Sequence, residues 1–164
     1  MNALMQPGAA WQRPMRVADL DTVLAIEAQC YSHPWTRGNF VDSLAAGYWA
    51  ELRLDAAGQC LGYFVAMPGV DEMHLLNLTV TPHHQRQGHA WAMLLDLRER
   101  ALQRGDRQLW LEVRQSNQVA RALYGRFGFT DAGVRRSYYP AAGARREDAV
   151  VMSLVLDGGA DALD

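Results

Sequence analysis

A polar segment with one glycine stands where a predicted strand is followed by a predicted helix. The strand ends at Val80, and the sequence HHQRQGHA over 83–90 leads into a helical pattern. The first N–H groups of a helix have no partner within the helix and carry partial positive charge, so they attract anions such as phosphate. Gly88 would let a ligand approach the backbone closely, and Arg86 could add a charged contact. Residues 85–90, the glycine loop, are therefore a candidate pyrophosphate site.

Residue types narrow the alternatives for this glycine loop. A P-loop would need Gly-Lys-Ser/Thr, but all 16 basic residues of the chain are arginine. A dinucleotide-binding fingerprint would need two earlier glycines directly after the strand, where Pro82, His83 and His84 stand instead. A glycine placed there only for steric reasons explains the pattern equally well. The five histidines form no HExxH motif and no Cys/His cluster, so we expect no metal site.

One carboxylate interrupts the apolar strand pattern RQLWLEV. The alternation of a strand places Leu109, Leu111 and Val113 on one face and Glu112 on the other. A carboxylate in so apolar a strand is costly unless a partner satisfies it. An ion pair with an arginine, or a strand end that reaches water, would do so. The functional alternative is a general base that accepts a proton from a reacting group.

Four aromatic side chains are either part of the core or part of a site. Tyr124 lies in the apolar stripe of a predicted helix, so the pattern alone favours a core tyrosine. Trp35 and the pair Tyr138–Tyr139 are candidate walls of a groove, or ordinary core and surface residues. Adjacent residues of a strand face opposite ways, so only one of the two tyrosines can line a groove unless the backbone leaves the sheet there.

Apolar periodicity predicts the order β-α-α-β-β-β-α-β-α-β-β, which indicates an α/β domain with a mostly antiparallel sheet. Asp19 and Asn117 are expected as N-caps, and Gly105 and Gly128 as helix ends. The helix after Gly88 should bury a stripe composed of Trp91, Leu94, Leu95, Arg98 and Leu102. We expect strands over 15–18, 48–55, 59–67, 72–80, 107–113, 129–139 and 148–156, and helices over 19–30, 37–46, 89–104 and 116–128.

The composition is typical of one globular domain. The chain has 164 residues, of which 49% are apolar and 21% charged, and a net charge of −2 that favours neither nucleic acid nor an anionic membrane as a partner. It shows neither a signal peptide nor a long apolar run. Two cysteines, Cys30 and Cys60, fit no disulfide scaffold and indicate a reduced, cytoplasmic protein. We expect a folded domain over 14–156 between weakly ordered tails, 1–13 and 157–164.

Several longer stretches resemble the GCN5-related N-acetyltransferase superfamily, in which a Q/R-x-x-G-x-G/A pattern follows a strand. Within it, residues 15–156 resemble the ribosomal-protein-alanine N-acetyltransferase (RimI) family. The combination WLEVRxSN…ALY followed by RRxYYP is far more specific than the glycine loop alone. The stretches that carry the resemblance are HPWTRGNF, NLTVTPHHQRQGHAWAMLLDL, LWLEVRQSNQVARALYGRFGF and VRRSYYPAAGARREDAVVMSL.

The resemblance implies a fold and a co-substrate. The expected fold is a single α/β domain with a mixed, mostly antiparallel seven-stranded sheet and about four helices packed on both faces. The co-substrate would be acetyl-coenzyme A, its pyrophosphate held by backbone amides of the glycine loop and its pantetheine arm by the strand before it. The residues implied in cofactor binding are Leu78, Thr79, Val80, Arg86, Gln87, Gly88, His89, Ala90, Trp91 and Asn117.

The resemblance also implies roles in acetyl transfer. Glu112 would take the ammonium proton through water, and Tyr124, 12 residues further on, would donate a proton to the coenzyme A thiolate. His89 departs from the family, which usually has an apolar residue there, and its protonation below about pH 6.5 would tighten pyrophosphate binding. The candidates for the substrate groove are Trp35, Tyr138 and Tyr139.

The acceptor that the resemblance implies is the N-terminal alanine of a small-subunit ribosomal protein. A terminal amine has a pKa of roughly 8 and lysine about 10.4, so neutralising them at pH 7 costs about 1.4 and roughly 4–5 kcal/mol respectively. One modest carboxylate base is adequate for the former. The alternatives are acetylation of a small amine or a protein lysine, and a coenzyme-A-binding regulatory module without turnover. We expect a monomer or weak dimer.

Overall fold

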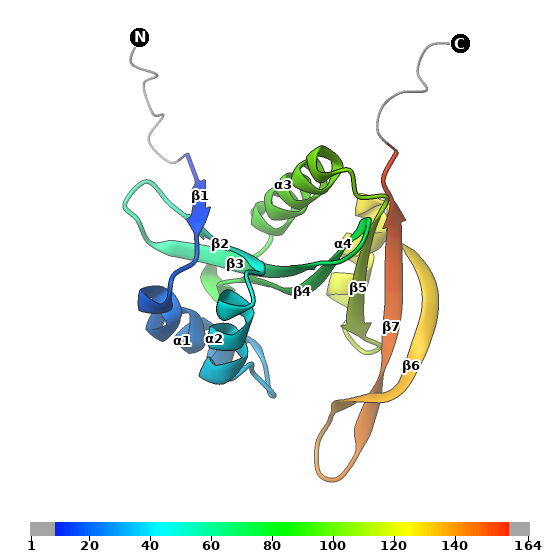
Figure 1. Cartoon of the computed structure of the whole chain (residues 1–164). Coiled ribbons are helices and arrows are strands. Elements are labelled where there is room, and N and C mark those ends of the chain that lie inside the picture. The colour runs from blue at the N-terminus through cyan, green and yellow to red at the C-terminus, as the bar shows by residue number, and fades with distance from the viewer. Residues whose placement is uncertain (1–8, 158–164) are drawn as a thin grey trace, which may run out of the picture. The chain divides into compact units, whose positions relative to one another are not determined.

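Seven strands form one mixed sheet in the computed structural model, which describes residues 9–157 (Figure 1). The strand order is β1-β2-β3-β4-β5-β7-β6, with β4 and β5 parallel and the pairs β1–β2, β5–β7 and β6–β7 antiparallel. The predicted single α/β domain, its element order and its mostly antiparallel sheet are confirmed. The elements are β1 Trp11–Pro14, α1 Leu20–Cys30, α2 Arg37–Ala45, β2 Trp49–Leu54, β3 Cys60–Pro68, β4 Glu72–Val80, α3 His89–Arg104, β5 Gln108–Arg114, α4 Gln118–Phe127, β6 Thr130–Pro140 and β7 Arg146–Val155.

The chain divides into two compact units. The first contains the residues up to Val65 together with Asn77–Met93, and the second contains Ala66–Leu76 together with the residues from Leu94 on. The boundaries fall inside β3, β4 and α3, so these three elements run continuously from one unit into the other.

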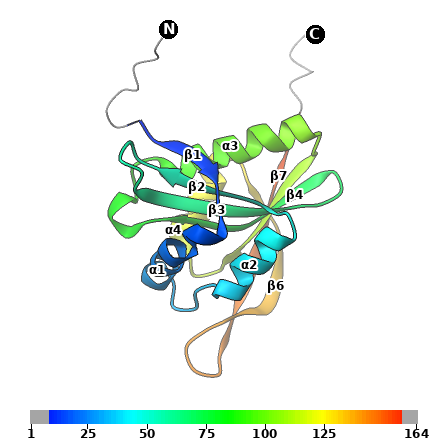
Figure 2. The same ribbon diagram turned by 60° about the vertical axis from the view of Figure 1, so that its left-hand side comes forward.

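The first unit is built around helices α1 and α2, which lie side by side (Figure 2). Its core joins Leu20, Val23 and Phe40 of these helices to Leu52 and Tyr63 of β2 and β3. Burying a side chain of this size contributes about 1.5–3 kcal/mol. The connection between the helices is fixed by a capping box, in which the Thr36 side chain accepts from the N–H of Asn39 and the Asn39 side chain accepts from the N–H of Thr36.

Strand β1 corrects the prediction for the N-terminal segment. Residues 11–13 were expected in a weakly ordered tail and the first strand at 15–18, but Trp11–Pro14 pairs with Glu51–Leu54. Asp19 was expected to cap α1, but its carboxylate forms an ion pair with Arg13 at 2.8 Å and makes no capping hydrogen bond. Residues 1–8 and 158–164 lie outside the described residues, and the expectation for them stays a prediction.

Helix α3 ends at Gly105, as predicted, where φ is +89°. Its buried face, however, is composed of Met93, Leu94, Leu97 and Ala101, whereas Trp91 and Leu95 are exposed. The predicted buried stripe is therefore wrong, because the buried face of the helix is rotated about the helix axis from the predicted one. A polar face that contains both Trp91 and Leu95 obscures the period, so side-chain polarity alone did not define the buried side.

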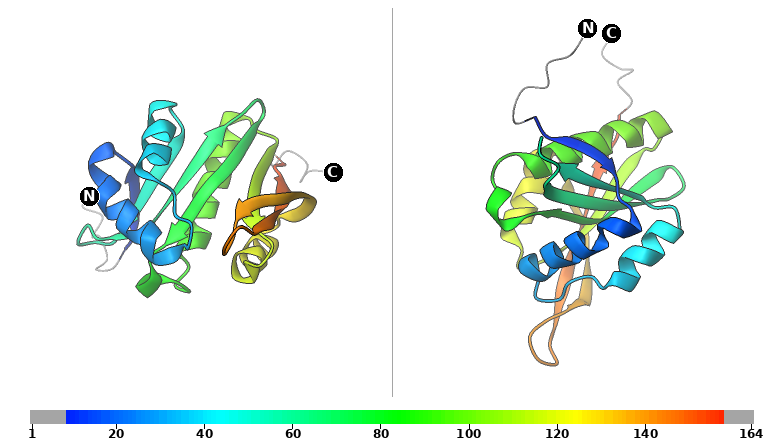
Figure 3. Two further views of the ribbon diagram at one scale, coloured as in Figure 1. Left: turned by 90° about the horizontal axis from the view of Figure 1, so that it is seen from below. Right: turned by 90° about the vertical axis from the view of Figure 1, so that its left-hand side faces the viewer.

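The second unit positions β5, α4 and the hairpin of β6 and β7. The Asn117 side chain caps α4 by accepting from the N–H of Ala120 at 3.2 Å, and Gly128 ends the helix with φ of +122°, both as predicted. Arg114, the last residue of β5, pairs with Ala149, so the hairpin continues past the end of β5 (Figure 3). None of the described helices is long and apolar enough to cross a membrane.

Candidate active site

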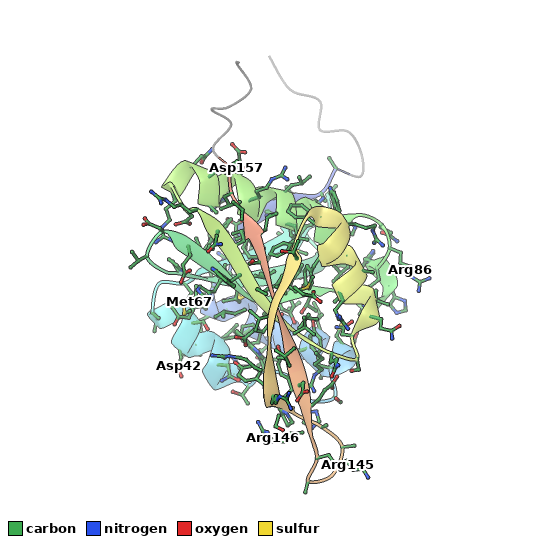
Figure 4. All side chains as sticks on the ribbon, turned by 90° about the vertical axis from the view of Figure 1, so that its right-hand side faces the viewer. Asp42, Met67, Arg86, Arg145, Arg146 and Asp157 are labelled. Atoms are coloured by element: carbon green, nitrogen blue, oxygen red, sulfur yellow. The ribbon has the colours of Figure 1, made fainter. Side chains whose placement is uncertain are left out.

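The glycine loop has the backbone geometry of an anion-binding turn. One turn of 3-10 helix over Pro82–His84 leads into Arg86 and Gly88, which both have positive φ, +63° and +87°. Such a conformation turns successive N–H groups toward one side, next to the N–H groups of the first turn of α3. A Cβ at Gly88 would contact nothing within 4 Å, so glycine is needed there for its φ rather than for space. The Arg86 side chain is exposed and points outward (Figure 4).

The end of β4 lies in the same unit as the glycine loop. Thr79 is buried, and Leu78 O lies 3.3 Å from the Tyr31 hydroxyl oxygen. Val80 O accepts a hydrogen bond from Gln85 Nε2 at 3.1 Å, which ties the glycine loop back to β4. The structure thus brings Leu78–Val80 and the loop together on one continuous segment.

His89, the first residue of α3, is bound by an arginine that the sequence analysis missed. Arg53 Nε donates to His89 Nδ1 at 2.9 Å, so the ring nitrogen that accepts this bond carries no proton. Burial, Arg53 and His84 together lower the pKa of His89. The charging that was expected below about pH 6.5 is therefore displaced to lower pH.

Trp35 lies between the two helices of the first unit. It is half-buried, its ring is 5.1 Å from that of Phe40, and its backbone N–H donates to the Glu27 carboxylate at 2.9 Å. The contacts of Trp35 are thus those of a core residue. Its role as a wall of the substrate groove stays a prediction. Glu27 itself was missed, although its place on the same helix face as Val23 and Ile26 was a detectable signal, a carboxylate in an apolar stripe.

Glu112 lies in the second unit on the half-buried face of β5, as the alternation predicted. Arg135 of β6 contacts its Oε1 at 3.0 Å, and the Glu112 side chain is 28% exposed. The ion-pair alternative therefore describes the structure. It does not conflict with a role as base, because the carboxylate remains accessible.

Tyr124 is 8% exposed and packs edge-on against Phe129, with 5.7 Å between ring centroids. Its helix also presents Asn117 at the first turn, and the Asn117 side chain is used as a cap. The core interpretation of Tyr124 and the capping interpretation of Asn117 thus both hold, and their roles toward a cofactor stay predictions.

Tyr138 and Tyr139 contact each other, with ring centroids 4.9 Å apart. The exception to the opposite orientation of adjacent strand residues applies here, because the backbone leaves the sheet. Register shifts between Arg135 and Tyr139, and Ser137 has a φ of +52°.

This bulge is held from the opposite strand. Asp148 Oδ1 accepts from the Ser137 N–H, and Arg146 donates to the Ser137 and Tyr138 carbonyls, each at 2.7 Å. Arg135 lies over the Tyr138 ring at 4.9 Å, so the ion pair of Glu112 adjoins the two tyrosines. Burial, with a contribution from Glu112, raises the pKa of Tyr139 to about 12.

Comparison with known proteins adds a family to this geometry. The model of the acetyltransferase (GNAT) family matches residues 20–129. The chain is 36% identical over 140 residues to the [ribosomal protein bS18]-alanine N-acetyltransferase of Escherichia coli K12, covering 85% of this chain and 93% of the relative. The corresponding enzyme of Haemophilus ducreyi is 36% identical over 138 residues, covering 84% and 94%.

A solved structure of such a relative has a similar fold. The crystal structure of the ribosomal-protein-S18-alanine N-acetyltransferase from Escherichia coli superposes with a TM-score of 0.83 and 32% identity, covering 95% of this chain and 99% of that one. Among residues 9–157, no three His, Cys, Asp or Glu side chains gather where they could hold a metal ion.

Proposed function

Because this chain belongs to the acetyltransferase (GNAT) family, we propose that it transfers the acetyl group of acetyl-coenzyme A to the α-amine of a ribosomal protein that begins with alanine. The observation that carries this proposal is the near-complete match to relatives of that activity, 85% of this chain and 93% of the relative. A ribosomal substrate would place the reaction in the cytoplasm, in keeping with two free cysteines.

The residues of the first unit would bind the co-substrate, which supplies the acetyl thioester. The positive-φ turn at Arg86 and Gly88 and the start of α3 support binding of a pyrophosphate through backbone N–H groups. A backbone amide at Leu78–Val80 would polarise the thioester oxygen, as an oxyanion hole does. This assignment agrees with the glycine loop being tied to β4 by Gln85.

The residues of the second unit would move protons. Glu112 accepts a proton from the substrate ammonium through water, which leaves a neutral amine to attack the carbonyl carbon. The nitrogen then loses its second proton to water, the carbon–sulfur bond breaks, and the Tyr124 hydroxyl stabilises the departing thiolate. Full transfer from a phenol of pKa about 10 to a thiol near 8.5 is uphill by roughly 2 kcal/mol, so a hydrogen bond is the main contribution of Tyr124 and the proton arrives later from solvent.

The test measures thiol release from acetyl-coenzyme A with two peptides. One has a free N-terminal alanine and no lysine, and the other is blocked at the α-amine and carries one lysine. We expect turnover with the first alone, and a loss of about 10²–10⁴-fold in kcat for Glu112→Gln. The matched control is Glu99→Gln, which changes an exposed carboxylate of α3 and should leave kcat unchanged.

The same assay separates the alternatives. Turnover with the lysine peptide would identify a lysine or small-amine acetyltransferase, and cofactor binding without thiol release from either peptide would identify a regulatory module. Tyr124→Phe should lower kcat roughly tenfold or more, the worth of one hydrogen bond to a charged group. An unchanged kcat in this variant would remove Tyr124 from the mechanism.

A further inference from the structure

A carboxylate that the proposed mechanism does not use is buried in the first unit. Glu27 of α1 is 1% exposed. Its Oε1 accepts from the Tyr63 hydroxyl at 2.7 Å and from Asn77 Nδ2 at 2.6 Å, and its Oε2 accepts from the Trp35 N–H at 2.9 Å. All three donors are neutral. A buried carboxylate is costly to maintain, which raises the question of what an acceptor-only group achieves here.

The hydrogen bonds continue from Glu27 along β4 to the surface. Asn77 Oδ1 accepts from the Thr79 hydroxyl at 2.7 Å, and Thr79 Oγ1 is 2.7 Å from the Tyr31 hydroxyl. Tyr31 follows the last residue of α1, and the residue as a whole is 37% exposed. The chain Glu27–Asn77–Thr79–Tyr31, the α1–β4 relay, thus connects a buried carboxylate with a tyrosine that reaches the surface.

The carboxylate fixes the direction of every bond in this relay. Glu27 can only accept, so Asn77 must turn its NH₂ toward it and its carbonyl oxygen toward Thr79. The single Thr79 proton is then used on Asn77, so Thr79 can only accept from Tyr31. The Tyr31 hydroxyl therefore donates its proton to Thr79, and its oxygen can accept hydrogen bonds from outside the relay.

A second acceptor lies beside that oxygen. The Leu78 carbonyl oxygen is 3.3 Å from the Tyr31 hydroxyl oxygen, and the phenol proton that could bridge them is used on Thr79. Two acceptor oxygens with no proton between them favour a cationic N–H donor. Burial raises the pKa of Tyr31 to about 12, so the phenol remains protonated at neutral pH and is no base.

We infer that Glu27 is a positioning residue that orients the relay so that the Tyr31 oxygen, together with Leu78 O, accepts hydrogen bonds from the substrate α-ammonium before it is deprotonated. This inference rests on the proposed function, since it assigns the ammonium of that substrate to these oxygens. It also gives a reason for a carboxylate over a glutamine at position 27: the Trp35 N–H would hold the amide oxygen, so the amide NH₂ would face Asn77 and the direction of the relay would be reversed.

The experiment compares two peptides as ligands of the enzyme with coenzyme A bound. One begins with alanine, and the other begins with N,N,N-trimethylalanine, which keeps the positive charge but has no N–H to donate. We expect the wild type to prefer the first by about tenfold or more, as for a hydrogen bond to a charged group. In Tyr31→Phe this preference should fall toward one, while the affinity for coenzyme A is unchanged.

Two threonine variants test the relay itself. Thr79→Val removes the inward acceptor of the Tyr31 proton and should reduce the preference, and Thr79→Ser should restore it relative to Thr79→Val. Thr81→Val is the matched control, because the Thr81 hydroxyl donates to Leu61 O outside the relay. Glu27→Gln should also reduce the preference for the alanine peptide. If that variant does not fold, Tyr31→Phe and the two Thr79 variants still test whether the relay orients the Tyr31 hydroxyl.

Failure of the inference is distinct from failure of the proposed function. If the wild type acetylates the alanine peptide but Tyr31→Phe and Thr79→Val keep the full preference for the N–H ligand, the relay is structural only and the inference is overturned. If the wild type shows no turnover with the alanine peptide, the proposed function fails first.

Discussion

At the scale of single residues, the ion pair of Glu112 is compatible with the proposed role of this carboxylate as a base. Its partner Arg135 is 55% exposed and contacts Oε1 at 3.0 Å. An exposed pair of this kind contributes about 0–1 kcal/mol, so it is easily broken. Arg135 also stacks over Tyr138, which couples the position of Glu112 to the tyrosine pair.

His89 provides a test of pH dependence at one residue. Its pKa is lowered from the ordinary value of 6.5 by burial and by Arg53 and His84. The folded protein therefore binds this proton less readily than the unfolded chain does, and stability should be lost as pH falls below about 6.5. His89→Leu removes the titrating group. We expect the melting temperature of the wild type to fall more steeply than that of His89→Leu between pH 7.5 and 5.

The cofactor affinity gives the second measurement on His89. With the imidazole neutral, the dissociation constant for coenzyme A should not change between pH 8 and 6.5 in either protein. Parallel melting curves for the wild type and His89→Leu, together with tighter binding already at pH 6.5, would show that the imidazole is charged there and contradict the prediction.

At the scale of elements, the approach of β3 to β4 depends on Gly62. A Cβ at this position would lie 2.4 Å from Thr79 O and 3.2 Å from Val80 Cα, which are backbone atoms that cannot rotate away. Gly62→Ala should therefore destabilise the fold by about 1–3 kcal/mol, as other overpacked sites do, and weaken cofactor binding by shifting β4. Urea unfolding and coenzyme A titration measure the two effects.

Gly125 offers the opposite case as a control. It lies in α4 without positive φ, and a Cβ there would meet nothing within 4 Å. Gly125→Ala should raise the unfolding free energy by about 0.5–1 kcal/mol, because alanine is the better helix former. If Gly62→Ala and Gly125→Ala changed the unfolding free energy alike, the backbone of β4 would be able to move away from a Cβ at position 62, which would contradict the prediction.

The sequence predicted the elements whose signals are local. Strand β4 has the predicted bounds Glu72–Val80, and Asn117 and Gly128 limit α4 as expected. Strand β1 was missed because its order comes from pairing with Glu51–Leu54 and not from its own pattern. The bulge at Ser137 was missed for the same reason, since Asp148 and Arg146 impose it from the next strand.

The site was predictable to a similar degree. A carboxylate in an apolar strand made Glu112 a candidate, either for an ion pair or for a base, and a strand, a glycine and a helix in series made the glycine loop a candidate site. Arg53 and Tyr31 could not be found this way, because their partners His89 and Thr79 are 36 and 48 residues away. Hydrogen bonds over such separations leave no periodic signal in the chain.

At the scale of the whole molecule, three elements link the two compact units. Strands β3 and β4 and helix α3 each begin in one unit and end in the other. Loss of either unit would interrupt all three of these elements within their length. The chain should therefore unfold in one cooperative transition, as small single domains usually do.

The tryptophans make this cooperativity measurable. Trp110 lies in the second unit, and the other four, Trp11, Trp35, Trp49 and Trp91, lie in the first. In Trp110→Phe, fluorescence therefore reports on the first unit alone, while far-ultraviolet circular dichroism reports on both. We expect coincident urea midpoints for the two signals, and coenzyme A at 100 times its dissociation constant should stabilise both by about 2.7 kcal/mol. Two separate midpoints, or a ligand effect confined to fluorescence, would show that the units unfold independently.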